Sequence, residues 1–258
     1  MAVTLHAHTT DSRHRPAGRL ERKFFLGPAK IGFAYGLLKH TCRLDPDFPS
    51  ERINSLYYDT ADLAEHERSI AGEFKKDKIR LRWYGDIHTL VGDQPVFVEL
   101  KSRRGFASTK QRRQVTVDAA ELMPERLQQG VLPWSFVAET LADFGYLPAR
   151  LLRPVIHISY WRYRFKELLT GQSVALDCHI RSTMVLPTFG NGETDLELPG
   201  AVLEIKGSRL VLPGTLVHTR LLETDWTRYS KYSASIEAHT EPIGAIGRLE
   251  PSGRLINI

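Results

Sequence analysis

The sequence predicts an α+β fold in which a mostly antiparallel sheet closes into a β-barrel, with helices packed outside it. Predicted strands outnumber helices, and the two do not alternate as they do in βαβ units. About six of the strands carry charged residues on one face and large apolar residues on the other, because side chains alternate along a strand. A barrel that encloses the charges and covers its apolar outer face with helices accounts for this pattern.

Composition sets broad limits on the kind of protein. The chain has 258 residues, 42% of them hydrophobic, and a net charge of +5. These values are ordinary for a globular protein, and they allow an anionic partner without requiring one. No apolar run approaches the roughly 20 residues that cross a bilayer, so no membrane segment is expected. The two cysteines, Cys42 and Cys178, are too few for a disulfide framework, which indicates a reducing, cytoplasmic location.

Three parts are expected along the chain. Residues 1–18 are polar, contain three histidines and end near Pro and Gly, which is typical of a disordered lead. Residues 19–240 are expected to form a single domain, because they contain no internal repeat and no obvious linker. Residues 241–258 form a tail rich in Gly and Pro.

In the first half of the domain, alternation of apolar and charged residues predicts the strands. A helix is expected over 28–40, where Pro28 stands near the start and apolar residues recur at helical spacing. The basic segment 103–114 is expected to begin as a loop. The strands expected here are 20–26, 53–60, 78–84, 95–103 and 113–120.

In the second half, a long strand over 154–165 is expected to pair with 173–183 across a turn near Gly171. Residues 187–200 are rich in turn formers and predict a loop, and Gly207 ends a further strand over 201–207. Apolar residues at helical spacing predict the helices. These are 119–129, 135–145, 214–223 and 230–239.

The stretch 78–84, KIRLRWY, places Lys78, Arg80 and Arg82 on one face of its strand. For a single strand, a face in solvent is the commoner explanation of such a pattern. Two observations favour an enclosed face instead. The charged faces contain few of the Ser, Thr and Gln residues that solvated faces usually include. In addition, the motif acid-x-Lys occurs three times, as Glu21–Lys23, Glu99–Lys101 and Glu204–Lys206.

The balance of the enclosed charges indicates the ligand. Buried charges cost several kcal/mol each unless they are paired, so a surplus of cations favours a polyanion. Arginine forks match phosphate oxygens, and the carboxylates suit a hard divalent cation. Nucleic acid is disfavoured, because the aromatic residues mostly lie opposite the cations. The expected inward cations are Lys23, Lys78, Arg80, Arg82, Lys101, Arg162, Arg164 and Arg181, and the expected inward acids are Glu21, Glu99, Asp177 and Glu204.

Taken in order, these motifs resemble a known family. LERKF, SLYYDT, KIRLRWY, FVELK followed by KQRR, YWRYRF, LDCHIR, LEIK and SKYS are similar to motifs of the triphosphate tunnel metalloenzymes, the CYTH-like superfamily. Within it the chain most resembles the VTC domain, the catalytic part of the vacuolar transporter chaperone polyphosphate polymerase. The resemblance covers residues 19–240. Leu20 stands where many tunnel enzymes carry a second acid, which fits the VTC branch better than the small triphosphatases and adenylate cyclases.

The resemblance implies a tunnel that binds ATP or another triphosphate and transfers the γ-phosphate to polyphosphate, with Mn²⁺ or Mg²⁺ as cofactor. Transferred to this sequence, it implies roles for three groups of residues. The cations expected to act in catalysis are Arg80, Arg82, Lys101, Arg162 and Arg181. Those expected to bind phosphate are Lys23, Lys78, Lys110, Arg112, Lys206 and Lys231. The expected metal ligand is Glu204, helped by Glu99, Glu21 or Glu237.

Two other functions stay open at this point. In a metal-dependent tripolyphosphatase or nucleoside triphosphatase, water would replace the phosphate acceptor in the same tunnel. In a non-enzymatic polyphosphate-binding protein, the tunnel would only hold the anion. The carboxylate at Glu204 argues against the second of these, because simple anion binding does not need a metal.

Overall fold

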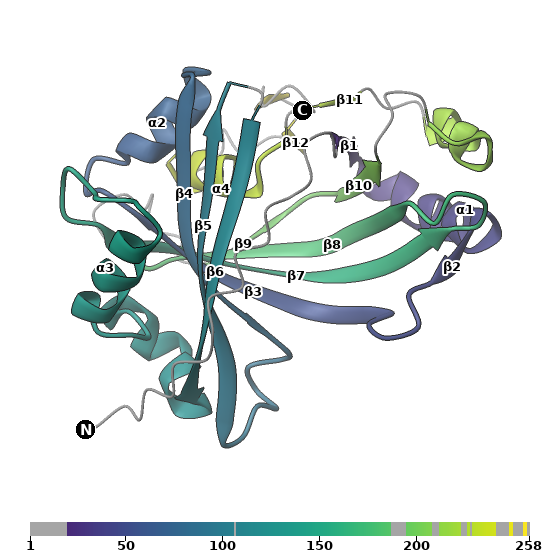
Figure 1. Ribbon diagram of the computed structural model, residues 1–258. Coiled ribbons are helices and arrows are strands. Elements are labelled where there is room, and N and C mark those ends of the chain that lie inside the picture. The colour runs from purple at the N-terminus through teal and green to yellow at the C-terminus, as the bar shows by residue number, and fades with distance from the viewer. Residues whose placement is uncertain are drawn as a thin grey trace. The chain divides into compact units, whose positions relative to one another are not determined.

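The computed structural model describes residues 20–105, 107–186, 195–207, 212–222, 226–227, 229–240, 248–249 and 255–256 (Figure 1). The predicted lead over 1–18 lies outside these residues. So does most of the tail, of which two short paired strands are described, β12 (Arg248–Leu249) and β13 (Leu255–Ile256). No described helix has the length and apolar character needed to cross a membrane.

The described chain divides into two compact units. The first unit comprises Ile53–Ile158 and 183–186, and the second comprises 20–52, 159–182 and the described residues from Asp195 onward. Each unit has its own buried apolar cluster.

The first unit is built on an antiparallel meander of four strands. Their apolar faces carry residues such as Leu81, Trp83 and Val98, which are fully buried. Leu127 and Leu141 from the following helical segments pack in the same cluster, and helix α2 packs against β4 (Figure 1). The elements are β3 (Ser50–Asp59), α2 (Ala64–Ile70), β4 (Lys75–Tyr84), β5 (Asp93–Arg104), β6 (Ala107–Asp118), the 3-10 helices η2 (Ala119–Leu122) and η3 (Pro124–Gln129), and α3 (Trp134–Asp143).

In the second unit, the first strand, β1, pairs with β10, a strand from late in the chain. Helix α1 packs beside β2 and η5. Its buried cluster joins Leu38 of α1, Leu176 of β8, Leu203 of β10 and Leu216 of η5. The strands are β1 (Leu20–Leu26), β2 (Cys42–Leu44), β7 (Arg153–Glu167), β8 (Ser173–Met184), β9 (Asp195–Leu198), β10 (Ala201–Gly207) and β11 (Trp226–Thr227). The helices are η1 (Pro28–Lys30), α1 (Ile31–Thr41), η5 (Gly214–Leu222) and α4 (Lys231–Thr240).

The prediction of an antiparallel α+β fold is confirmed, but the prediction of a closed barrel is wrong for the described strands. Their hydrogen-bonded order is β11-β1-β10-β8-β7-β3-β4-β5-β6, with β2 on β7 and β9 on β8. This order has two ends. Described β6 pairs along its length with β5, while β11 has two residues and pairs only with Lys23 and Phe24. The described strands therefore form an open order with β11 at one end and β6 at the other.

Several predicted boundaries also change. The basic segment 103–114 is mostly strand, because β5 and β6 are joined by a tight turn that includes Gly105 at φ +58°. A Cβ at Gly105 would lie 2.6 Å from the Phe74 side chain, so only glycine fits this turn. The loop expected over 187–200 contains β9, and the helices expected over 119–129 and 214–223 are 3-10 helices.

Candidate functional site

The cations of the first unit gather on one face of β4, β5 and β6. In antiparallel strands, residues directly opposite one another share a face. The register therefore arranges the side chains in cross-strand rows, which contain many more cations than acids. The rows are Lys78–Lys101–Lys110, Arg80–Glu99–Arg112 and Arg82–Phe97–Gln114.

Glu99 is the centre of this face, and we call it and its four cations the Glu99 cluster. Its carboxylate is 1% exposed and receives Arg80 at 2.7 Å and Lys110 at 2.6 Å. Arg112 lies at 3.4 Å and Arg82 at 3.9 Å. Burial alone would raise the pKa of Glu99, but the charges of Arg80, Arg82 and Lys110 outweigh it and hold the pKa far below its ordinary value. Glu99 is therefore ionised, and one negative charge faces four positive ones.

Lys110 shows the effect of this surplus. Burial, together with repulsion from Arg80 and Arg82, lowers the pKa of Lys110 to about 7, although Glu99 acts in the opposite direction. An incoming anion would favour the charged amine. The Glu99 cluster is thus electrostatically poised for a negatively charged ligand.

Two of the cations are held by neutral partners from β3. Arg80 donates to the Tyr57 hydroxyl at 2.9 Å, and Arg82 donates to the Ser55 hydroxyl at 3.3 Å. Aromatic residues therefore share this face with the cations, contrary to the general expectation from the sequence. The reason is the strand register, which sets Tyr57 opposite Arg80 and Phe97 opposite Arg82. The residue pattern within one strand does not show which residues of the neighbouring strands lie opposite it.

The second unit contains a cluster of a different composition, which we call the Glu204 cluster. Its charged faces come from β1, β10, β8 and β7, together with the first residue of α4. It contains nearly as many acids as cations, so most of its charges can be paired within the cluster. Its members are Glu21, Lys23, Arg162, Asp177, Glu204, Lys206 and Lys231.

Asp177 anchors two cations of the Glu204 cluster. It is fully buried, and its two oxygens accept from Arg162 at 2.6 and 2.7 Å. Lys231 donates to it at 2.6 Å from the start of α4. Burial would raise the pKa of Asp177, but Arg162 and Lys231 lower it to about 2. Asp177 therefore holds both cations in fixed positions.

Glu204 lies beside Asp177 and is 5% exposed. It accepts from Arg162 at 3.1 Å and forms an ion pair with Lys206 at 3.1 Å. Burial opposes its ionisation, but Lys206, a hydrogen bond with Glu21 and nearby cations hold its pKa well below the ordinary value. The carboxylates of Glu204 and Glu21 thus lie together in a cationic setting.

The carboxylates of Glu204 and Glu21 fit Mg²⁺, a divalent cation that needs few protein ligands. Among the residues that the structure describes, no group of three or more His, Cys, Asp or Glu is arranged to hold an ion. Mg²⁺, however, usually takes one or two carboxylates and completes its shell with water and substrate phosphates. Glu204 and Glu21 match that requirement. Glu99 belongs to the other unit and is occupied by cations, and Glu237 is a half-buried residue of α4.

The structure does not bring every predicted residue into these clusters. Arg181 is exposed and pairs with Glu197 at 3.0 Å, and Arg164 pairs with Glu51 at 2.5 Å. The alternation of β8 is interrupted at His179, which has φ +51°. That left-handed residue changes which side chains face outward and leaves Arg181 63% exposed. Lys78 and Lys101 are half-buried in the row beside Lys110.

Sequence reasoning missed the residues that position the cations. Tyr160 contacts two of them, with Lys231 4.7 Å and Arg162 5.5 Å from its ring centroid. In the first unit, the hydroxyls of Tyr57 and Ser55 position Arg80 and Arg82 through hydrogen bonds. Tyr57 lies in the motif SLYYDT, but nothing in that motif indicates which arginine it would meet.

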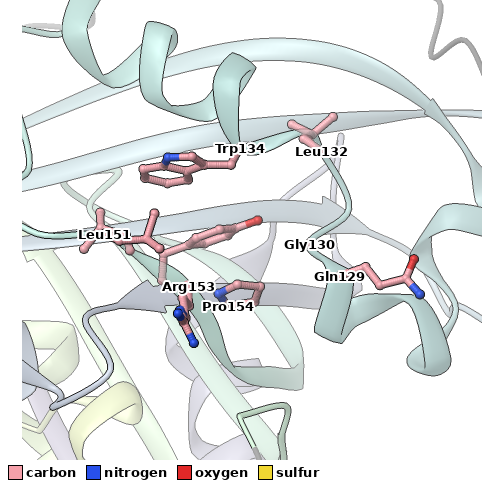
Figure 2. Close-up of a pocket in the computed structure, with 9 residues that line it drawn as sticks. Gln129, Gly130, Leu132, Trp134, Leu151, Arg153 and Pro154 are labelled. Atoms are coloured by element: carbon pink, nitrogen blue, oxygen red, sulfur yellow. The ribbon is translucent and has the colours of Figure 1, made fainter.

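A separate pocket lies in the first unit between residues 129–134 and 151–154 (Figure 2). Its volume is about 310 Å³, and its lining is mainly apolar. Trp134 and Leu132 lie on one side of it, and Arg153 and Pro154 on the other. None of the predicted site residues lines this pocket, so it is distinct from the two charged clusters.

Residues 19–239 match the family model of the VTC domain. No curated protein matches the chain. A proposed adenylate cyclase from Bacillus halodurans is 13% identical with a TM-score of 0.46, and the alignment covers 83% of this chain and 95% of that chain. Another, from Vibrio parahaemolyticus, is 11% identical with a TM-score of 0.40, covering 86% and 99%.

Proposed function

The chain belongs to the VTC domain family, and from this membership we propose that it is a phosphotransferase that moves the γ-phosphoryl group of ATP onto phosphate or a polyphosphate chain. The acceptor would be inorganic phosphate at first and the end of the growing polymer afterwards. Divalent Mn²⁺ or Mg²⁺ would assist.

One observation carries the proposal. In the Glu99 cluster, a single buried carboxylate faces four cations, and the adjacent row of Lys78, Lys101 and Lys110 contains cations alone. Like charges in one row repel each other unless an anion lies between them. A chain of phosphates supplies negative charge at regular intervals and offers oxygens that match arginine forks. This favours a phosphate polymer or triphosphate over a single small anion.

The chain's own residues would act mainly by position and charge. Transfer of a phosphoryl group requires little covalent chemistry from a protein and much electrostatic stabilisation. Arg162, Lys206 and Lys231 are held rigidly by buried carboxylates, so they need no reorganisation when charge develops on the transferred group. Glu204 and Glu21 would hold the divalent metal, which would supply positive charge to neutralise part of the charge that develops during transfer.

The main alternative is hydrolysis, in which water accepts the phosphoryl group. Incubation of the purified protein with ATP and Mn²⁺, followed by gel separation of the products, distinguishes the two. A ladder of polyphosphate is expected. Free phosphate alone would contradict the transferase and support a triphosphatase, and unchanged ATP would support a protein that only binds polyphosphate.

Glu204→Gln tests the metal assignment in the same assay. The amide keeps the shape of the side chain but loses the negative charge that a hard cation requires. We expect the metal-dependent rate to fall on the order of 10²-fold or more, as when a charge-stabilising group is removed from an active site. The matched control is Glu125→Gln, an exposed residue of η3, which should keep the full rate. Full metal-dependent activity in Glu204→Gln would contradict the assignment.

A further inference from the structure

Arg112 differs from the other cations of the Glu99 cluster in how it is held. The central carbon of its guanidinium lies 3.3 Å from the centroid of the Phe97 ring, which places the guanidinium flat on that ring. Arg80 also has an aromatic neighbour, but its guanidinium carbon lies 5.7 Å from the Tyr57 centroid. Phe97 therefore fixes the plane of Arg112 and covers one face of it.

The edge of the same guanidinium is also fixed. Its Nη2 donates to the Tyr84 hydroxyl at 3.1 Å, and its Nε lies 3.4 Å from a Glu99 oxygen. Tyr84 meets Phe97 edge to face, with ring centroids 5.9 Å apart and an angle of 72° between the rings. Phe97 beneath the guanidinium, together with Glu99 and Tyr84 along one edge, therefore restricts its orientation.

The Arg112 side chain is 29% exposed, so part of it can meet a ligand. Its guanidinium carbon lies much closer to the Phe97 ring than to the Tyr84 ring, whose centroid is 5.9 Å away. The Nε–Nη2 edge of Arg112 already faces Glu99 and Tyr84, so this fork is less available to a phosphate. A guanidinium plane held against an aromatic ring is also a surface on which a nucleobase stacks.

We propose that Arg112, supported by Phe97, is the stacking platform for the base of the bound nucleoside triphosphate. The inference rests on the proposed function, because it assumes that the protein binds a nucleotide at its cationic face. Stacking uses the π-face that every base has, so the platform recognises a nucleobase as a class and discriminates little between bases. It assigns Arg112 a role other than the phosphate contact expected from the sequence.

Two ligands and one conservative substitution test the proposal. Calorimetric titrations in the presence of Mg²⁺ would compare the β,γ-imido analogue of ATP with imidotriphosphate, which lacks the nucleoside. Arg112→Lys keeps the positive charge but removes the plane. We expect it to weaken binding of the ATP analogue by about tenfold and to leave imidotriphosphate within about twofold, since stacking of one base contributes on this order. Phe97→Leu, which removes the support, should act in the same direction.

Controls separate the possible failures. Arg113→Lys, next in sequence but paired with Asp143 of α3, should change neither affinity. Equal losses for both ligands in Arg112→Lys would overturn the platform and return Arg112 to phosphate binding. Equal affinity of the unmodified protein for both ligands would also overturn it, because the base would then contribute nothing. If neither ligand binds the unmodified protein, the proposed function fails, and the platform, which rests on it, fails as well.

Discussion

At the scale of single residues, the same side-chain types behave differently according to what surrounds them. Lys231 and Lys110 both donate to a buried carboxylate at 2.6 Å. Lys231 shares Asp177 with Arg162, whereas Lys110 shares Glu99 with Arg80 and Arg82. Burial, together with repulsion from these two arginines, lowers the pKa of Lys110 to about 7. The charges around the shared carboxylate therefore differ between the two lysines.

Lys110 makes ligand binding depend on pH near neutrality. Because its pKa in the free protein is lowered to about 7, the amine loses its proton as the pH rises through that value. A neutral amine does not attract phosphate, so the affinity for tripolyphosphate should fall above pH 7, by up to about tenfold per pH unit until the pKa of the complex is reached. Below pH 7 the contribution of Lys110 is fully present.

Lys110→Arg provides the control, since arginine keeps its proton throughout. Titrations of tripolyphosphate between about pH 6 and 9 should show a steeper loss of affinity for the unmodified protein than for the variant. Protonation of the ligand itself affects both proteins equally and cancels in the comparison. Parallel pH profiles would contradict the prediction.

At the scale of elements, the accuracy of the sequence predictions depended on where the determining contacts lie. β1 and β10 were predicted well, because Glu21–Lys23 and Glu204–Lys206 define a strand face by their spacing alone. α2 was missed because its N-terminal N–H groups are capped from a distance. The carboxylate of Asp59 accepts from Glu65 and His66, six and seven residues further along the chain. Spacing rules for helix starts look only at the adjacent residues.

Glu167 is a second carboxylate that joins separate elements. At the end of β7 it accepts from the backbone of Leu169 at 3.0 Å and Thr170 at 2.6 Å, and from the hydroxyl of Thr215 at the start of η5. Burial opposes its ionisation, but the hydrogen bonds from Thr170, Thr215 and Leu169 lower its pKa to about 2. It therefore fastens the β7–β8 turn to η5.

Glu167→Gln should lower the free energy of unfolding by about 2 kcal/mol, since its amide group meets donors that then lack an acceptor. The sign of the pH effect follows from the lowered pKa. The stabilisation by Glu167 is present above its unfolded pKa of about 4.3 and is lost as the pH falls toward 2. Urea unfolding at pH 7 and pH 3 should thus show a smaller difference between the two proteins at pH 3. An equal difference at both pH values would contradict this account.

At the scale of the whole molecule, the sequence predicted the chemistry of the faces better than their arrangement. Alternation identified the cations that share one face of β4 and β5, because it depends on local period alone, whereas Lys110 and Arg112 of β6 were expected only from the resemblance. Closure of the sheet depends on the pairing of its outermost strands, and β11 has two residues that no pattern in the sequence marks. Arg181 was expected to face inward for a similar reason, since a left-handed residue at His179 is not visible in the alternation.

The surplus of positive charge should make stability depend on polyanions. A ligand that binds only the folded protein stabilises it by about 2.7 kcal/mol at a hundredfold excess over its dissociation constant. Tripolyphosphate should therefore raise the melting temperature, and added NaCl should reduce the shift by screening. Sulfate at matched ionic strength is the control, and a shift as large as that of tripolyphosphate would show that the effect does not require a phosphate chain.

The two cysteines have a practical consequence for following ligand binding by fluorescence. Cys42 and Cys178 are both buried, and burial with the nearby charge of Asp177 raises the pKa of Cys178 to about 11. Both thiols should thus be slow to react with maleimide dyes. A cysteine introduced at Ser108, opposite Arg103 near the tip of the β5–β6 hairpin, would then take the dye selectively. The native protein therefore already has a low labelling background, and a single substitution would turn it into a reporter of anion binding.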